Sequence, residues 1–180
     1  MITILTAQDR QAQPWKNGGG TTRPVMSVPG RKLEFGWRIS LADVAVPGPF
    51  SRFPAISRLM GILEGRLRLE VDGLPPQELV PGGPAFAFPG DAPAFGTPLG
   101  GMVKDINLMF DPTCFEASLH FVAAKTREPG SGATHLLLAL ASLSLNGHGL
   151  GPLDAALIPA GIGFEAQGGA FWQARLMPLP

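Results

Sequence analysis

The residues best suited to chemistry lie in one short stretch, Trp15–Arg23, which reads WKNGGGTTR. Two cations, an amide, two hydroxyls and an indole ring surround three consecutive glycines there. Glycine lets backbone N–H groups approach a ligand closely, and successive N–H groups can form an anion-binding concavity. The spacing matches neither a P-loop nor a dinucleotide-binding loop. A binding loop and a tight turn therefore explain the glycines equally well.

Two predicted strands, Phe35–Val44 and Val103–Phe110, carry polar residues at alternate positions: Arg38, Ser40, Asp105 and Asn107. Alternate side chains of a strand share one face, so each strand has one apolar face and one mixed face. The mixed face meets solvent in an ordinary antiparallel sheet. It lines a ligand pocket if the sheet closes into a small barrel, and Ala42 and Met109 would then supply apolar wall.

Arginine is the natural anchor for a carboxylate, because its planar guanidinium donates two parallel hydrogen bonds and stays charged when it is desolvated. Arg23, Arg38 and Arg58 are the candidates here. An ion pair with Asp43, Asp91 or Asp105 is the structural alternative for each of them. We expect at least one of the three to point into a cavity, with Asp105 as an internal partner when the site is empty.

The histidines and the cysteine do not form a recognisable catalytic or metal-binding pattern. Cys114 is the only cysteine, which excludes an intramolecular disulfide and a cysteine-cluster metal site. His120 alternates with apolar residues and should lie on the polar face of a strand. His135 opens an apolar strand and is expected to be structural, and His148 is expected in an exposed turn. We expect no metal, no cofactor and no catalytic residue.

Alternation of apolar and polar residues with a period of two dominates the chain and predicts an all-β protein. Each predicted strand is bounded by Gly or Pro; the strands cover Thr21–Val28, Phe35–Val44, Ser57–Leu63, Arg66–Val71, Ala85–Phe88, Val103–Phe110, Phe115–Phe121 and His135–Leu145. Many short antiparallel strands with such corners favour a jelly roll or barrel. Within that class, the order of strands and turns from Leu63 to Gly83 resembles the cupin barrel.

The sequence also repeats itself. Leu67–Gly73 aligns with Leu143–Gly149, and Val80–Phe86 aligns with Ile158–Phe164. The two halves therefore look like copies of one supersecondary unit.

Composition narrows the class of protein. A hydrophobic content of 45% in 180 residues can fill a real core, in one domain or in two small ones. The formal net charge is zero and no basic run occurs, so we expect neither nucleic acid nor a membrane as a partner. The N-terminus reaches Asp9 and Arg10 too soon to hold a secretory apolar core, and we expect a cytoplasmic protein.

Several independent motifs between residues 14 and 110 resemble the HutD/Ves family. They are Trp15–Arg23, Phe35–Val44, Gly48–Pro54, Arg58, Phe88–Asp91 and Asp105–Met109. The resemblance implies a bicupin, with an N-terminal cupin barrel over residues 1–115 and a structural, cupin-like barrel over 116–180, between which strands can be exchanged. Cupin enzymes usually hold their metal with an H-x-H motif, but the corresponding segment here carries Ser51, Arg52 and Phe53.

The family is associated with histidine utilisation, and some members with stress responses. The resemblance therefore implies a regulatory or sensing protein that binds a small anionic metabolite such as urocanate or formylglutamate. The expected ligand-binding residues come from the glycine loop and the polar strand faces: Trp15, Lys16, Asn17, Gly18, Gly19, Thr22, Arg23, Arg38, Ser40, Phe53, Arg58, Asp105 and Asn107. Arg38 or Arg58 would take the carboxylate.

Two other classes of function stay open on the sequence alone. A metal-independent isomerase or epimerase would use Asp105 as general base. A scaffold would instead act through a partner protein, using apolar edges of the barrels. Cupin pairs often dimerise by adding strands, so a homodimer is a further expectation, although no residue specifies its interface.

Overall fold

Period-two patterning identified the longer strands between residues 20 and 122, but it predicted no strand after residue 145, where the structure has four, and it missed several short ones before that point. The computed structural model describes residues 1–15 and 18–180, and it divides them into two units. The N-terminal unit is Gln11–Thr113, and the C-terminal unit joins Met1–Arg10 to Cys114–Pro180. Residues 1–10 were expected in the first barrel, but β1 (Thr3–Leu5) pairs with β17 (Ala155–Ile158), which is an exchange of the kind that the sequence left open.

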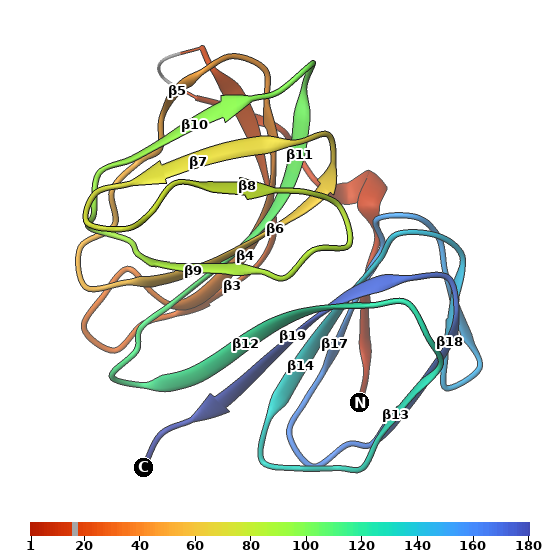
Figure 1. Cartoon of the computed structure of the whole chain (residues 1–180). Coiled ribbons are helices and arrows are strands. Elements are labelled where there is room, and N and C mark those ends of the chain that lie inside the picture. Colours follow the sequence, from red (N-terminus) through yellow and green to blue (C-terminus); the bar gives the residue numbers. More distant parts are fainter. Residues whose placement is uncertain (16–17) are drawn as a thin grey trace. The chain divides into compact units, whose positions relative to one another are not determined.

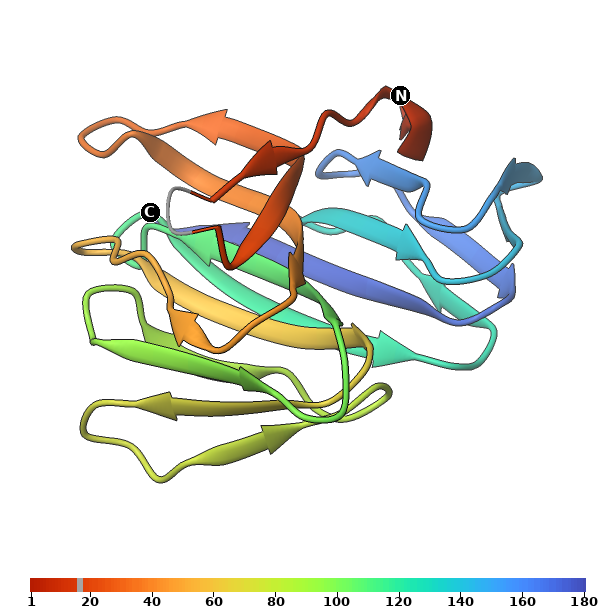
Figure 2. The same ribbon diagram turned by 90° about the horizontal axis from the view of Figure 1, so that it is seen from above.

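The N-terminal unit consists of strands β2 (Gln13–Pro14), β3 (Gly20–Pro29), β4 (Phe35–Val44), β5 (Gly48–Pro49), β6 (Ser57–Glu64), β7 (Leu67–Val71), β8 (Gln77–Leu79), β9 (Phe86–Pro89), β10 (Ala94–Pro98) and β11 (Val103–Phe110) (Figure 1). One sheet has the order β2-β3-β4-β11-β6-β9 and the other β5-β10-β7-β8. The named strands of both sheets pair antiparallel. Figure 2 shows the two sheets as separate layers.

The C-terminal unit contains a short 3-10 helix, η1 (Ala7–Asp9), and the strands β1, β12 (Phe115–Val122), β13 (Thr126–Glu128), β14 (Thr134–Ala139), β15 (Leu143–Leu145), β16 (His148–Leu150), β17, β18 (Phe164–Gly168) and β19 (Phe171–Pro178). Its sheets have the orders β1-β17-β14-β19-β12 and β13-β18-β15-β16. The predicted strand His135–Leu145 is two strands, because the chain turns at residues 140–142 between β14 and β15. No helix among the residues described has the length and hydropathy needed to traverse a bilayer.

The strand orders confirm the internal repeat. The run β9-β6-β11-β4 corresponds to β17-β14-β19-β12, and β8-β7-β10-β5 corresponds to β16-β15-β18-β13. The alignment of Leu67–Gly73 with Leu143–Gly149 pairs the correct strands, β7 with β15, but slips at the turn: Gly73 lies in the β7–β8 turn and Gly149 lies in β16. The alignment of Val80–Phe86 was one strand off: this segment precedes β9, whereas Ile158–Phe164 follows β17.

Each unit has an apolar core between its two sheets. In the N-terminal unit, Met60, Ile62 and Val103 from one sheet join Leu67 and Leu69 from the other. In the C-terminal unit the corresponding cluster includes Leu137, Ala156, Leu145, Phe164 and Phe171. Alternate residues on the inner strand faces supply these side chains, as the period of two requires.

The mixed face of β4 and β11 is turned inward. Ser40, Asp105 and Asn107 on it are buried, which rules out the solvent-facing alternative for these residues. The opposite, apolar face of the same strands is buried too, as Ile39, Leu108 and their neighbours show. Burial on both faces means that the polar residues must find partners inside the fold or in a cavity.

Candidate functional site

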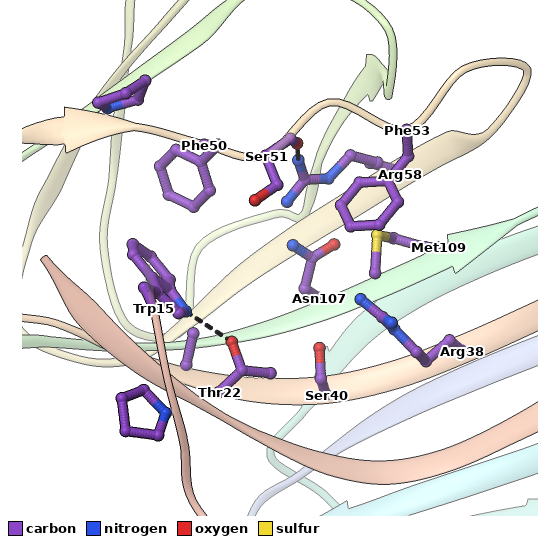
Figure 3. A pocket seen from close by; sticks show the side chains of 13 residues that line it. Trp15, Thr22, Arg38, Ser40, Phe50, Ser51, Phe53, Arg58, Asn107 and Met109 are labelled. Atoms are coloured by element: carbon purple, nitrogen blue, oxygen red, sulfur yellow. Dashed lines mark hydrogen bonds between the residues drawn. The ribbon is translucent and has the colours of Figure 1, made fainter. Parts of the chain in front are cut away.

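A cavity of about 490 Å³ lies in the N-terminal unit (Figure 3). Its volume falls within the usual range for a small-molecule site. The described residues that line it come from five segments of the unit: Pro14, Trp15, Thr22, Arg38, Ser40, Ala42, Pro49, Phe50, Ser51, Phe53, Arg58, Asn107 and Met109. Strands β4, β6 and β11 supply one side, and the β2–β3 hairpin and residues 49–53 supply the rest.

Strand register brings the two lining arginines together. Met109 on β11 lies opposite Arg38 on β4 and opposite Arg58 on β6. Cross-strand neighbours have Cβ atoms about 5 Å apart, so the two arginines flank Met109 in one row. In the next row, Asn107 lies opposite Ser40. The geometry of the sheet thus gathers two cations, an amide and a hydroxyl that are far apart in the sequence.

Arg58 is held among aromatic rings rather than by a carboxylate. It is 4% exposed, and its guanidinium carbon lies 4.8 Å from the ring centre of Phe88 and 5.5 Å from that of Phe50. Nη1 donates to the backbone oxygen of Ser51 at 3.2 Å, and Nε has no hydrogen-bond partner in the described protein. Burial lowers the pKa of Arg58 to about 10, while Asp105 acts in the opposite direction. The side chain stays charged at neutral pH.

Arg38 has a similar environment at the other side of Met109. Its guanidinium carbon lies 5.0 Å from the ring centre of Phe35 and 5.3 Å from that of Phe53. Burial lowers its pKa and Glu34 raises it in part. Its Nε is buried with no hydrogen-bond partner in the described protein. Figure 3 shows Arg38 and Arg58 on either side of Met109, with Asn107 beside them.

Asn107 and Asp105 share a face of β11 but differ in access to the cavity. Asn107 lines it, and its Oδ1 is buried without a hydrogen-bond partner. Asp105 is not among the lining residues; it lies two residues further along the strand, opposite Ala42 and Ile62, and is fully buried. The structure therefore does not place Asp105 where a ligand in the cavity would touch it.

The aromatic walls are fixed by local contacts. The indole Nε1 of Trp15 donates to Oγ1 of Thr22 at 2.7 Å, across the β2–β3 hairpin. The Trp15 ring packs edge to face on Phe50 with 5.8 Å between ring centres. Because Trp15 and Phe50 are held in place before any ligand arrives, ordering them adds little to the cost of binding.

Two of the three glycines, Gly18 and Gly20, are required by backbone conformation and close packing. Gly18 has φ of 70°, and its N–H donates to the Trp15 oxygen at 3.0 Å. A Cβ on Gly20 would collide with the backbone oxygen of Asp43 and lie 3.2 Å from the Trp15 ring. The expected site residues Gly18 and Gly19 do not line the cavity. The expected Lys16 and Asn17 lie outside the described residues.

Arg23 is engaged in a surface ion-pair cluster. Its Nη1 pairs with Oδ2 of Asp43, whose Oδ1 lies 3.2 Å from Nζ of Lys104. These hydrogen bonds and charges lower the pKa of Asp43, although burial opposes them. Arg23 does not line the cavity, so it takes the structural role that the sequence offered as its alternative.

Four lining residues were not predicted from the sequence: Pro14, Pro49, Phe50 and Ser51. Phe50 and Ser51 lie in the Gly48–Pro54 motif, but no periodicity marks this segment, since β5 is two residues long. The backbone oxygen of Ser51, not its hydroxyl, holds Arg58. A backbone role of this kind leaves no signal in residue type.

None of the three histidines is among the described residues that line this cavity. His135 is buried in the C-terminal unit, where its Nδ1 lies 3.2 Å from Nε2 of Gln173 and its ring packs on Phe164. This confirms the structural role expected for it. His120 and His148 are exposed, the latter at the start of β16. Over the described part of the chain, no group of three or more His, Cys, Asp or Glu is arranged to hold a metal.

Solved structures similar to this chain identify the fold. HutD from Pseudomonas fluorescens, described for a formate condition, is 28% identical and covers 100% of both chains with a TM-score of 0.92. A conserved protein of unknown function from Pseudomonas aeruginosa is 32% identical over 100% of both chains, with a TM-score of 0.85. YhhW from Escherichia coli shares only the fold, at 10% identity and a TM-score of 0.71. The bicupin expectation is confirmed.

Sequence comparisons agree with the structural ones. An uncharacterised 21.2 kDa protein in the hutC 3' region of Pseudomonas putida is 40% identical over 143 residues, which are 78% of this chain and 75% of that protein. The HutD family model matches residues 7–170. The match extends well beyond the motifs between residues 14 and 110 and takes in most of the C-terminal unit. This chain belongs to the HutD family, a family of cupin-type proteins.

Proposed function

We propose that the N-terminal unit binds a small anionic metabolite in its cavity, and that this binding gives the protein a regulatory or sensing role. The observation that carries this proposal is the pair formed by Arg38 and Arg58. Both guanidinium groups border the cavity, each has a buried Nε without a partner, and no described lining residue is acidic. Arg58 is buried and Arg38 is partly buried, and no hydrogen bond or ion pair joins either guanidinium to a carboxylate of the described protein. Such desolvated cations are costly, and an anionic ligand would compensate them.

Cavity shape and family context suggest the class of ligand. A planar or short-chain carboxylic acid would place its carboxylate between the arginines. A guanidinium group can donate two parallel hydrogen bonds to a carboxylate, and these charge-assisted bonds are stronger than those between neutral groups. Trp15, Phe50 and Phe53 would cover its apolar part, while Asn107 and Ser40 would meet a polar group. The HutD family is linked to histidine utilisation, and the Pseudomonas putida relative is named for its place beside hutC. We therefore propose an acid of the urocanate or formylglutamate type.

The lining favours binding over turnover. A general base must come within hydrogen-bond reach of its substrate, and Asp105, the base that the enzymatic alternative requires, does not line the cavity. The described lining residues include no His, Cys, Asp, Glu, Lys or Tyr. Those residue types are the usual donors for proton transfer and for catalytic metals. We propose that the site works without a metal.

A thermal-shift screen tests the proposal, because a ligand that binds only the native state raises the melting temperature. Urocanate, N-formylglutamate and formate should raise it, and uncharged amides of the same size should not. Arg38→Ala should weaken binding roughly 10- to 100-fold, since a charge-assisted hydrogen bond contributes about 1.5–3 kcal/mol. Arg66→Ala is the matched control, because Arg66 pairs with Glu78 at the surface, away from the cavity lining. No shift with any acid would contradict the proposal.

A further inference from the structure

Asp105 is a buried carboxylate that no group in the described protein satisfies. It is 0% exposed, and neither Oδ1 nor Oδ2 has a hydrogen-bond partner. Its cross-strand neighbours, Ala42 and Ile62, offer no polar side chain. An ionised carboxylate in such a place is strongly disfavoured. Burial raises the pKa of Asp105 to about 7, so it changes charge in the neutral range.

The charges around Asp105 come from two neighbouring strands. Arg58 on β6 attracts the carboxylate and lowers its pKa, and Asp43 on β4 repels it and raises its pKa. Arg38, also on β4, repels the charge of Arg58 and lowers the pKa of Arg58. The facing sheet presents apolar residues of β7 to this core, while the charged Arg68 and Glu70 of that strand are exposed. Lys104, the residue before Asp105, belongs to the other face of β11 and pairs with Asp43 at 3.2 Å. Arg58 is therefore the charge that favours the ionised form of Asp105.

Arg58 lines the cavity, and it shares one face of the sheet with Asp105, which lies opposite Ile62, four residues further along β6. In the empty site its positive charge is the one that makes an ionised Asp105 tolerable. A carboxylate ligand that pairs with Arg58 would compete for the same charge, and two carboxylates around one guanidinium disfavour the ionised form of the more deeply buried one. No donor around Asp105 would replace the lost attraction.

We infer that an anion bound to Arg58 in the cavity makes Asp105 take up one proton from the solvent, so that this protein binds anion and proton together. The inference rests on the proposed function. It makes Asp105, which does not line the cavity, a residue that determines how tightly the site binds an anion. In this state the anion, rather than Asp105, balances Arg58, and the protonated carboxyl is neutral. Asp105 thereby sets the charge of a site that it does not touch.

Linkage gives the size and sign of the effect. An anion whose own charge is constant should bind more tightly as the pH falls, because binding consumes a proton. The apparent affinity should change by up to about tenfold per pH unit at and above neutral pH, and should level off once Asp105 is protonated in the free protein. N-formylglutamate is a suitable probe, because carboxyl groups stay ionised between about pH 6 and pH 9.

Calorimetry in buffers of different ionisation enthalpy counts the protons. At pH 7.5 about a quarter of Asp105 is protonated already in the free protein, so the native chain should take up roughly 0.5 to 0.75 proton per N-formylglutamate. Asp105→Asn should bind the same probe with no proton uptake and with an affinity independent of pH from about 6 to 9. Asp72→Asn, the same substitution at an exposed turn carboxylate, should behave like the native chain. In the native chain, the ¹³C carboxyl resonance of Asp105 should shift to the protonated position on adding the probe.

The outcomes separate this inference from the proposed function. Binding without proton uptake, with the Asp105 resonance unchanged, would overturn the inference and leave the anion site intact. Failure of N-formylglutamate, urocanate and formate to bind at any pH would overturn both. Proton uptake that persists in Asp105→Asn would assign the proton to another group and overturn the inference as well.

Discussion

The two barrels share one strand topology but use equivalent positions differently. In the N-terminal unit one inner row holds Arg38, Met109 and Arg58; in the C-terminal unit the equivalent row holds Ser118, Arg175 and His135. His135 is buried and bonded to Gln173, which is the counterpart of Asn107 in the next row. Arg58 and Asn107, in contrast, keep polar atoms without partners.

The strands beside these rows differ as well. β3 pairs with β4 and carries Thr22 into the cavity wall, and Trp15, the residue after β2, is hydrogen-bonded to Thr22. β12, the counterpart of β4, is the last strand of its sheet in the described chain. His120 on β12 is exposed, whereas the equivalent Ser40 is buried. A cupin barrel therefore offers a candidate site where additional strands enclose polar groups that have no hydrogen-bond partner in the fold.

The largest effect that we expect on stability is at Asp105. Its native pKa is raised above the unfolded value, so the stability present at acid pH is lost as the pH rises through the neutral range. Asp105→Asn should therefore stabilise the protein at pH 8, on the order of 3 kcal/mol, and should have little effect at pH 4. Urea unfolding of both chains at each pH measures the difference. A variant that is less stable than the native chain at pH 8 would show that Arg58 requires this charge.

A second expected effect concerns the walls that only the N-terminal barrel has. Gly20→Ala should destabilise the β2–β3 hairpin by about 2 kcal/mol and displace Trp15, because the new methyl group has no room beside the Asp43 backbone. Gly149→Ala, in the β15–β16 hairpin, is the control, because nothing lies within 4 Å of the added Cβ. Chemical unfolding and anion titration would check both. Equal effects of the two substitutions would remove the distinction between the barrels.

The smallest effect should appear at His135, with the opposite sign of pH dependence. Burial lowers its native pKa below the unfolded value, so the stability it contributes is present above the unfolded pKa and is lost as the pH falls. The cost of His135→Gln should therefore shrink between pH 7 and pH 5. Amide exchange at β14 and β19 would follow this change within the C-terminal unit. A cost that grows with acidity would contradict a neutral histidine at this position.

Patterning predicted the fold better than the site. β4 and β11 were predicted to the residue, because polar and apolar residues alternate through the middle of each strand. Seven of the expected ligand residues line the cavity: Trp15, Thr22, Arg38, Ser40, Phe53, Arg58 and Asn107. Several of these could be predicted because residues two apart in a strand lie on the same face of the sheet, so that one polar face brings them together.

Other features depend on contacts that local sequence does not encode. Asp105 shares its face with Asn107, and only the packing around it decides that one reaches the cavity and the other does not. Arg23 was expected among the ligand residues because it follows the glycine loop in the sequence. The pairing of β3 with β4 instead brings it to Asp43, with which it forms an ion pair. The turn after Ala139 was missed because the apolar run continues through it.

The proposed function requires that Arg38 and Arg58 bind an anion in the N-terminal barrel. The most direct measurement is an NMR titration of the arginine Nε–H resonances with N-formylglutamate or urocanate. We expect the resonances of Arg38 and Arg58 to shift along one saturation curve, while that of Arg175, at the Met109 position of the second barrel, stays in place. A shift of Arg175 alone, or none at concentrations that saturate the thermal shift, would contradict it.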